Sequence, residues 1–427
     1  MIMRTAVALL ACLALLLSPA PAPAEGPQAT YVLRVPAPKG ESAQRLLGLG
    51  YDVLEQRDGD DLFVVGDPKT AGKLRTDGYP ATVEKTMPPA PWAPRSIGDA
   101  TYYGGYRTIT AHLAHLDEVA KAHPGLATVV DYGDSWRKTQ GNGGYDLKAL
   151  CVTRKGPGDC ALTPTAPKPR LFVMGQLHAR EITTGDMAWR FIDDLVGSDL
   201  TAMLADVEVW VVPIANPDGV EIVESGGDSP VLQRKNANGT CTSGSRGVDL
   251  NRNAGSHWGE VGSSTSKCSE TYRGPRADSE VEVQALESLW RKLYRDTRAP
   301  GDTAAASADT TGAVVSMHSY GDYVLFPWGW STQKTGNDAA LRKMANDMAA
   351  LSGYTAGQPG EVLYNASGAT DDWVYDDLGV PSFVWEIGTD SGRCGGFLPP
   401  FSCQEDAHWP KVRPMLVSAM KAAKRPY

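Results

Sequence analysis

The chain has 427 residues, of which 42% are hydrophobic, and its formal net charge is −9 at pH 7. This length suits one large domain plus a smaller one, and the apolar content excludes a disordered or fibrous protein. No block of basic residues occurs, so the sequence offers no surface for binding nucleic acid.

Residues 1–24 have the pattern of an export signal. Arg4 precedes an apolar stretch, and small residues and prolines then lead to Ala24, after which we expect cleavage. The stretch is shorter than the roughly 20 apolar residues of a membrane helix, and no later segment approaches that length. A lipid anchor at Cys12 is a weaker alternative, because apolar residues continue beyond it. We expect a secreted protein without membrane contact once the signal is removed.

Residues 25–86 are predicted to form a small α+β domain. Residues 87–100 follow as a proline-rich segment that cannot sustain a helix or a central strand, and we interpret them as an exposed linker. The runs of the small domain favour the order β-α-β-β-α-β, with strands at 31–35, 52–56 and 62–66 and helices at 42–49 and 69–77.

Residues 101–427 alternate between strand-like and helix-like runs. The alternation favours a largely parallel sheet covered by helices on both faces. On the first helix, His112 and His115 lack carboxylate neighbours and are predicted to be solvated. The predicted strands are 171–175, 207–213, 313–317 and 381–385, and the predicted helices are 109–122, 182–195, 278–294, 338–350 and 409–424.

All cysteines except Cys12 remain after the signal is removed, and their even number in an exported chain favours disulfides. A cysteine metal site is disfavoured because no Cys-x-x-Cys pair occurs. Six cysteines allow 15 pairings, and the sequence does not choose among them. Pairing between sequence neighbours is the simplest expectation, joining Cys151 to Cys160, Cys241 to Cys268, and Cys394 to Cys403.

Candidate metal ligands follow two predicted strands. His178 and Glu181 come after strand 171–175, and His318 comes directly after strand 313–317. Both groups therefore lie at the carboxyl ends of strands, where open α/β sheets bind ligands. Two imidazoles and one carboxylate leave a tetrahedral position on zinc free for water or substrate. Taken alone, His-x-x-Glu is a weak signal, since a surface histidine and a solvated glutamate would give the same pattern.

Glu386 ends a third strand. Beside the apolar run 381–385 its carboxylate would be partly desolvated, and the raised pKa would suit a general base that acts on metal-bound water. A structural ion pair is the alternative.

Several motifs together resemble the zinc metallocarboxypeptidases of the pancreatic carboxypeptidase A/B type, including their secreted bacterial members. The resemblance runs from about Tyr103 to the end of the chain, with the motifs in the family's order. It implies a three-layer α/β/α fold with a mixed, mostly parallel central sheet, preceded by a small α+β propeptide domain. The motifs are His178-Ala-Arg-Glu181, Asn216-Pro-Asp-Gly219, Asp249-Leu-Asn-Arg-Asn253, Cys268-Ser-Glu-Thr-Tyr272, His318-Ser-Tyr320, Tyr364-Asn-Ala-Ser-Gly368 and Glu386.

The resemblance also implies a role for each site residue. One Zn²⁺ ion would be held by His178, Glu181 and His318, with Glu386 activating its water and Arg234 stabilising the oxyanion. Zinc is the default, because similar sites accept other divalent ions. Taken one at a time, such residues are more often ordinary core or surface groups. The remaining roles are a terminal-carboxylate clamp of Asn251 and Arg252, closure over the substrate by Tyr364, upstream subsites lined by Arg180 and Tyr320, and a hydrogen bond from Asp249 that orients a zinc-bound histidine.

Asp371 lies seven residues beyond Tyr364, where the family has the floor of the pocket for the departing side chain. An acid there implies a preference for Lys or Arg, because an apolar guest would leave a buried carboxylate unpaired. The other aligned positions are small or apolar and could still admit apolar residues. They are Leu325, Gly329, Leu363 and Val384.

The expected partners are the C-termini of peptides or proteins and an activating protease that cuts the linker, with Arg95 a candidate cut site. The small domain would then be an inhibitory propeptide rather than an accessory domain, and the enzyme a monomer. Two other functions are compatible with the motifs: a zinc amidase or peptidase of this fold that acts on cell-wall peptides, and an inactive binding module. The clamp argues against the first and the complete set of catalytic residues against the second.

Overall fold

The computed structural model describes residues 29–39, 41–239, 241 and 245–427, except for residues 88–99. The predicted signal and most of the predicted linker therefore lie outside the described residues. Within the described part, every helix is too short or too polar to cross a membrane.

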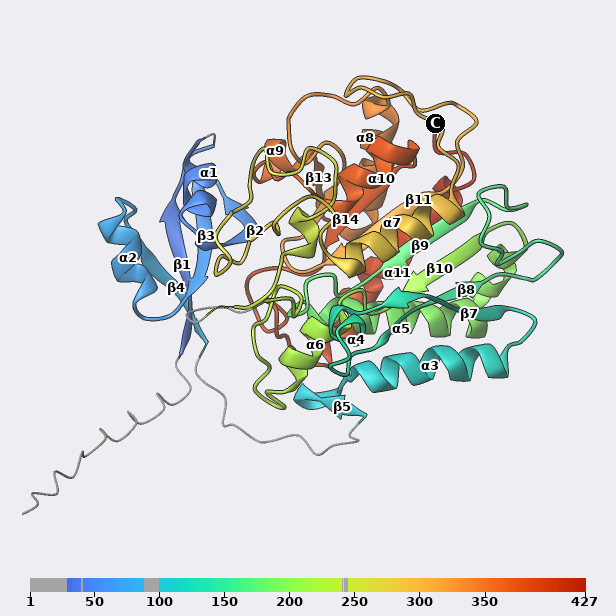
Figure 1. Ribbon diagram of the computed structural model, residues 1–427, viewed down its shortest axis with the longest axis horizontal. Helices are drawn as coiled ribbons and strands as arrows, with labels where there is room; N and C mark the ends of the chain where they lie inside the picture. Colours follow the sequence, from blue (N-terminus) through green and yellow to red (C-terminus); the bar gives the residue numbers. More distant parts are fainter. Residues whose placement is uncertain (1–28, 40, 88–99, 240, 242–244) are drawn as a thin grey trace, which may run out of the picture.

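The N-terminal unit is a four-stranded antiparallel sheet with two helices, in the predicted order β-α-β-β-α-β. Leu33, Val35, Leu62 and Val64 from its strands pack against Leu46 of the first helix. Figure 1 shows this unit as a blue lobe beside the larger unit. Its elements are β1 (Thr30–Pro36), α1 (Glu41–Gly48), β2 (Asp52–Asp58), β3 (Asp61–Gly66), α2 (Thr70–Thr76) and β4 (Thr82–Met87).

The larger unit is built on an eight-stranded mixed sheet with the order β13-β12-β14-β11-β9-β10-β8-β7. Its four central strands are parallel and buried along their whole length. Three antiparallel pairings, β12 with β14, β8 with β10 and β7 with β8, make the sheet mixed. The strands are β7 (Ala127–Asp134), β8 (Asp146–Val152), β9 (Arg170–Met174), β10 (Glu208–Val212), β11 (Ala313–His318), β12 (Tyr323–Leu325), β13 (Thr355–Gly357) and β14 (Ser382–Glu386).

Helices cover both faces of this sheet. On β9, Leu171 and Val173 belong to one apolar core and Phe172 and Met174 to the other, because successive side chains of a strand point to opposite faces. The result is the predicted three-layer α/β/α arrangement (Figure 1). The first core contains α3 (Ile109–Ala122), α5 (Ile182–Gly197), α8 (Asp338–Ser352) and α11 (Trp409–Ala422), and the second contains α7 (Val281–Leu293) and α10 (Thr370–Leu378).

Short elements and three disulfides complete the larger unit. Each disulfide links sequence neighbours, as expected: Cys151 to Cys160, Cys241 to Cys268, and Cys394 to Cys403. The short elements are the strands β5 (Thr101–Tyr102) and β6 (Tyr106–Arg107) and the helices α4 (Trp136–Thr139), α6 (Pro217–Glu224) and α9 (Pro359–Val362).

The prediction that His112 and His115 are solvated is wrong. Their side chains are 1% and 7% exposed, because this face of α3 packs against α5. His115 stacks on Trp189 at 3.7 Å between ring centroids and bonds Asp193 at 2.8 Å, whereas His112 meets the edge of the same indole.

Candidate active site

His178, Glu181 and His318 converge at the carboxyl ends of the neighbouring strands β9 and β11. The loop after β9 carries His178, Glu181 caps the start of α5, and His318 is the last residue of β11. The Nδ1 atom of His178 lies 2.8 Å from Oε1 of Glu181, and the Nδ1 atom of His318 lies 3.0 Å from Oε2. All three side chains are 1% exposed. The sheet thus brings together three ligands that are far apart in the sequence.

The donor set fits a zinc ion. The two Nδ1 atoms are 3.0 Å apart, while the opposite nitrogen of each ring contacts another group, Asp249 at 3.1 Å for His178 and Ser316 at 2.9 Å for His318. Two buried ring nitrogens and a carboxylate that face one another are stabilised best by a cation between them. Among the described residues, one other cluster has metal-ligand side chains, and both of its cysteines form a disulfide.

Glu386 lies beside the ligands because β11 and β14 pair in register, with His318 opposite Glu386. Its side chain is 2% exposed, and its Oε2 atom has no hydrogen-bond partner within the described part of the chain. Burial, and then the negative charges of Glu181 and Glu55, raise the pKa of Glu386 well above its usual value. These surroundings suit a group that accepts a proton.

Asp249 couples a ligand to an arginine. Its two oxygens bind Nε2 of His178 at 3.1 Å and Nε of Arg234 at 3.0 Å. Burial opposes the charged carboxylate, but Arg234 and His178 hold the pKa of Asp249 well below its usual value. The backbone beside Arg234 is fixed by Gln233, whose side-chain amide donates to the carbonyls of Lys235 and Arg246 at 3.1 and 2.7 Å. Arg234 is therefore held rigidly within the site.

Asn251, Arg252 and Tyr364 line a pocket next to the ligands, with an empty volume of about 440 Å³. The Oδ1 atom of Asn251 accepts the backbone N–H of Thr370 at 3.0 Å, and Nε of Arg252 donates to the carbonyl of Gly262 at 3.0 Å. The hydroxyl of Tyr364 donates to the carbonyl of Val53 in the N-terminal unit at 3.4 Å. Polar donors thus gather at one side of the pocket.

Asp371 lies in the first turn of α10 and lines the same pocket, where it is 4% exposed. Burial raises the pKa of Asp371 to about 6. Its neighbour Asp372 points elsewhere, since it accepts the backbone N–H groups of Gly329 and Trp330 at 2.8 and 3.2 Å. The remaining wall is largely apolar and includes Leu325, Pro359, Leu363, Ala366, Ala369 and Val384.

Arg180 and Tyr320 lie outside this pocket. Arg180 is 1% exposed with its guanidinium 4.3 Å from the ring centre of Phe397, and Tyr320 packs edge-on against that ring at 4.8 Å between centroids. Tyr320 and Phe397 belong to an apolar cluster that also contains Leu54 and Phe63 of the N-terminal unit. Arg180 lies at the edge of this cluster, against Phe397. The site therefore has two parts, a pocket beside the ligands and a separate aromatic surface around Arg180.

Two further residues of the site, Asp52 and Glu55, belong to no motif and were not predicted. Both lie on β2 of the N-terminal unit; Glu55 lines the pocket beside the ligands, and Asp52 pairs with Arg180. Oε1 of Glu55 lies 3.0 Å from Nη2 of Arg234 and 3.8 Å from Nη2 of Arg252. Although burial opposes its charge, Arg234 lowers the pKa of Glu55. A carboxylate thus already occupies the cationic side of the pocket.

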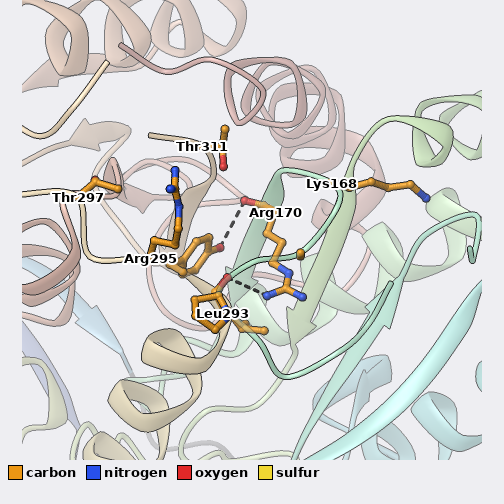
Figure 2. A pocket seen from close by; sticks show the side chains of 9 residues that line it. Lys168, Arg170, Leu293, Arg295, Thr297 and Thr311 are labelled. Atoms are coloured by element: carbon orange, nitrogen blue, oxygen red, sulfur yellow. Dashed lines mark hydrogen bonds between the residues drawn. The ribbon is translucent and has the colours of Figure 1, made fainter. Parts of the chain in front are cut away.

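A second hollow lies at the amino end of β9, the opposite edge of the sheet (Figure 2). Its buried cation, Arg170, already binds Glu208 at 2.5 Å and the carbonyl of Leu293 at 2.8 Å. Lys168 is likewise paired, with Asp159 at 2.8 Å. Arg295, the third cation of this hollow, is paired with Asp309 at 3.3 Å, and the hollow lies at the sheet edge opposite the metal-ligand group.

The chain is similar to known proteins. A family profile described as zinc carboxypeptidase matches residues 112–406. Carboxypeptidase B2 of Homo sapiens is 30% identical over 70% of this chain and 66% of its own length, and carboxypeptidase B of Astacus astacus is 30% identical over 70% and 91%. The chain thus spans about two thirds of the length of the human relative. The solved carboxypeptidase A of Helicoverpa armigera superposes with a TM-score of 0.71 at 24% identity, over 94% of this chain and 100% of that one, and supports the predicted fold.

Proposed function

Since this chain belongs to the zinc carboxypeptidase family, we propose that it releases single residues from the C-termini of peptides and proteins. Lys and Arg would be released in preference to other residues. Family membership makes it a zinc-dependent metallocarboxypeptidase, with one catalytic Zn²⁺ ion expected at the His-Glu-His group. The observation that carries the proposal is the carboxylate of Glu55, which lies between Arg234 and Arg252 in the pocket beside the ligands. A peptide's terminal carboxylate would take its place.

The clamp of Asn251 and Arg252 would restrict cleavage to the last residue of a peptide. Arg252 offers a charged fork and Asn251 an amide, and both line the pocket that would hold the last residue of a peptide. A terminal carboxylate can satisfy them, whereas an internal peptide bond or a terminal amide would leave the buried guanidinium without a counter-charge. Tyr364 lies over the same space and would close it from solvent.

When bound, zinc would polarise the scissile carbonyl and acidify a water molecule. Glu386 would accept the proton from that water and pass it to the leaving amine, since its Oε2 atom is unpartnered and its pKa is raised. Arg234, fixed by Asp249, would direct its free Nη1 atom at the carbonyl oxygen as negative charge develops there.

Asp371 would select the leaving residue. A Lys or Arg side chain can lay its methylene groups along Leu325, Leu363 and Val384 and place its charge at Asp371. An apolar side chain could use the same wall but would have to desolvate the acid. A basic preference with some activity on apolar residues follows.

The N-terminal unit would keep the precursor inactive. Strand β2 covers the pocket: Val53 accepts a hydrogen bond from Tyr364, and Glu55 faces Arg234 and Arg252. A substrate therefore cannot reach the pocket while this unit is in place. We expect export through residues 1–24, cleavage by an activating protease within residues 87–100, and a monomeric mature enzyme.

Cleavage of matched peptides tests this function. Peptides that end in Arg, Lys, Leu, Phe or Glu, each as free acid and as amide, are incubated with processed enzyme, with and without a chelator. Chelator-sensitive release of Arg and Lys from the free acids is expected. Comparable release of Leu or Phe would reduce Asp371 to a partial selector, cleavage of the amides would favour an amidase, and no release at all would favour a binding module.

A further inference from the structure

Arg180 carries a buried charge whose partner comes from the N-terminal unit. Its Nη1 and Nη2 atoms bind the two oxygens of Asp52 at 2.5 and 2.8 Å. Two parallel bonds to one carboxylate are the geometry in which arginine binds acids most specifically. Among the residues that the structure describes, Asp52 is the one acid in an ion pair with Arg180.

The surroundings of this pair make the charge costly to leave alone. The ring of Phe397 lies against the guanidinium, Tyr320 packs on Phe397, and Leu54 and Phe63 cover the cluster from the N-terminal unit. A cation in such a frame of low polarity interacts more strongly with a counter-charge than it would on an open surface. Removal of the N-terminal unit takes Asp52 away together with Leu54 and Phe63 but leaves Phe397 and Tyr320 in place, so a bound peptide would restore both the cover and the counter-charge.

Arg180 lies outside the pocket for the leaving residue, and under the proposed function it would contact the residues that precede the scissile bond. The pocket lined by Asn251, Arg252 and Asp371 holds the leaving residue, and Arg180 is not part of it. Strand β2 spans the two regions, with Asp52 at Arg180 and Glu55 at the clamp. Three residues of extended strand cover about 10 Å. A bound peptide of similar extent would bring one of the residues before the scissile bond to Arg180.

We propose that the mature enzyme prefers acidic peptides, namely those with Asp or Glu among the three residues that precede the released Lys or Arg. The side-chain carboxylate would replace that of Asp52 on Arg180. This inference rests on the proposed function and names the substrate class for it.

The test is a positional scan with processed, zinc-loaded enzyme. In an alanine peptide that ends in Arg, each of the three preceding positions is replaced in turn by Glu, Gln or Lys, and kcat and KM are measured. We expect kcat/KM at one position to be roughly tenfold higher for Glu than for Gln, and lower for Lys than for Gln, since only the carboxylate of Glu forms charge-assisted hydrogen bonds with the guanidinium.

Variants assign any preference to Arg180. In Arg180→Gln the ratio of Glu to Gln peptides should fall to about one, and in Arg180→Lys part of it should remain, because the charge is kept without the fork. Arg190→Gln, which removes a partly exposed arginine of α5 that is paired with Glu405, should keep the full ratio. Such ratios cancel any general loss of activity.

Two outcomes would overturn the proposed preference for acidic peptides while the proposed function stands. One is equal cleavage of Glu and Gln peptides at all three positions while the alanine peptide is cleaved in a chelator-sensitive manner. The other is an acidic preference that persists in Arg180→Gln. If no peptide loses its last residue, the proposed function fails, and this inference fails with it.

Discussion

At the floor of the pocket, the protonation of Asp371 should set the choice of substrate. Its pKa of about 6 means that the carboxylate is charged above that pH and takes up a proton below it. A cationic guest needs the charged form and an apolar guest the neutral one. The kcat/KM for an Arg peptide divided by that for a Leu peptide should therefore rise with pH through about 6, by up to tenfold per pH unit.

In Asp371→Asn the same ratio should stay flat between pH 5 and pH 8, and cleavage of the Arg peptide should fall by roughly ten- to a hundredfold. The two peptides share Glu386 and the metal, so titrations of the catalytic groups cancel in the ratio. A wild-type ratio that does not change with pH would show that Asp371 stays charged throughout.

Glu386 gives a second prediction at this scale. Glu386→Gln keeps the shape of the side chain but removes its ability to accept a proton, so kcat should fall about 10²- to 10⁴-fold. Zinc content, measured by elemental analysis, should equal that of the wild type, because the three ligands are unchanged. A variant with full activity would require another base.

At the scale of single elements, the strands that carry the site were predictable because they are buried on both faces and read as continuous apolar runs. Strands at the ends of the sheet were not. β12 and β13 are three residues long, and β7 is mostly half-buried without a continuous apolar run. The helix α3 was located, but its two histidines were assigned to solvent because spacing does not show which neighbour a helix face meets.

The buried His112 should make the fold acid-sensitive. Burial, with Arg107 and His115 nearby, lowers the pKa of His112 to about 3, and neither of its nitrogens has a hydrogen-bond partner among the described residues. The unfolded chain, with a histidine pKa near 6.5, therefore binds more protons between pH 3 and 6.5. Stability from this group is full above about pH 6.5 and is lost as the pH falls toward 3.

His112→Phe should remove this pH-dependent contribution to stability while it keeps an aromatic ring against Trp189. Between pH 7 and pH 4.5 the free energy of unfolding should decrease by about 2–3 kcal/mol more in the wild type than in the variant. Denaturant titrations at the two pH values measure the difference, to which the other titrating groups contribute equally. Parallel losses in both proteins would place a proton-accepting partner at His112.

At the scale of the whole molecule, the contact between the two units was beyond sequence reasoning. The family motifs located every proposed ligand and clamp residue, because each is tied to a strand end or a short signature. Asp52 and Glu55 belong to a strand with no motif, and their function depends on where the N-terminal unit docks. Docking is set by surface shape and charge, which have no sequence period.

Glu55 provides the test of that contact. In the uncleaved chain, Glu55→Gln removes the charge that faces Arg234 and Arg252, so the N-terminal unit should cover the pocket less tightly. We expect the activity of the uncleaved variant on an Arg peptide to be roughly tenfold above that of the uncleaved wild type. After processing, both should be equally active, because the substituted residue has been removed.

Glu84→Gln is the matched control, since Glu84 lies on the exposed strand β4 and pairs with Arg34 inside the N-terminal unit. It should leave the uncleaved chain as inactive as the wild type. If the uncleaved wild type already equals the processed enzyme, the N-terminal unit is an accessory domain, and the carboxylate in the pocket does not block access. If Glu84→Gln releases as much activity as Glu55→Gln, inhibition depends on the stability of the unit as a whole rather than on the charge that enters the clamp.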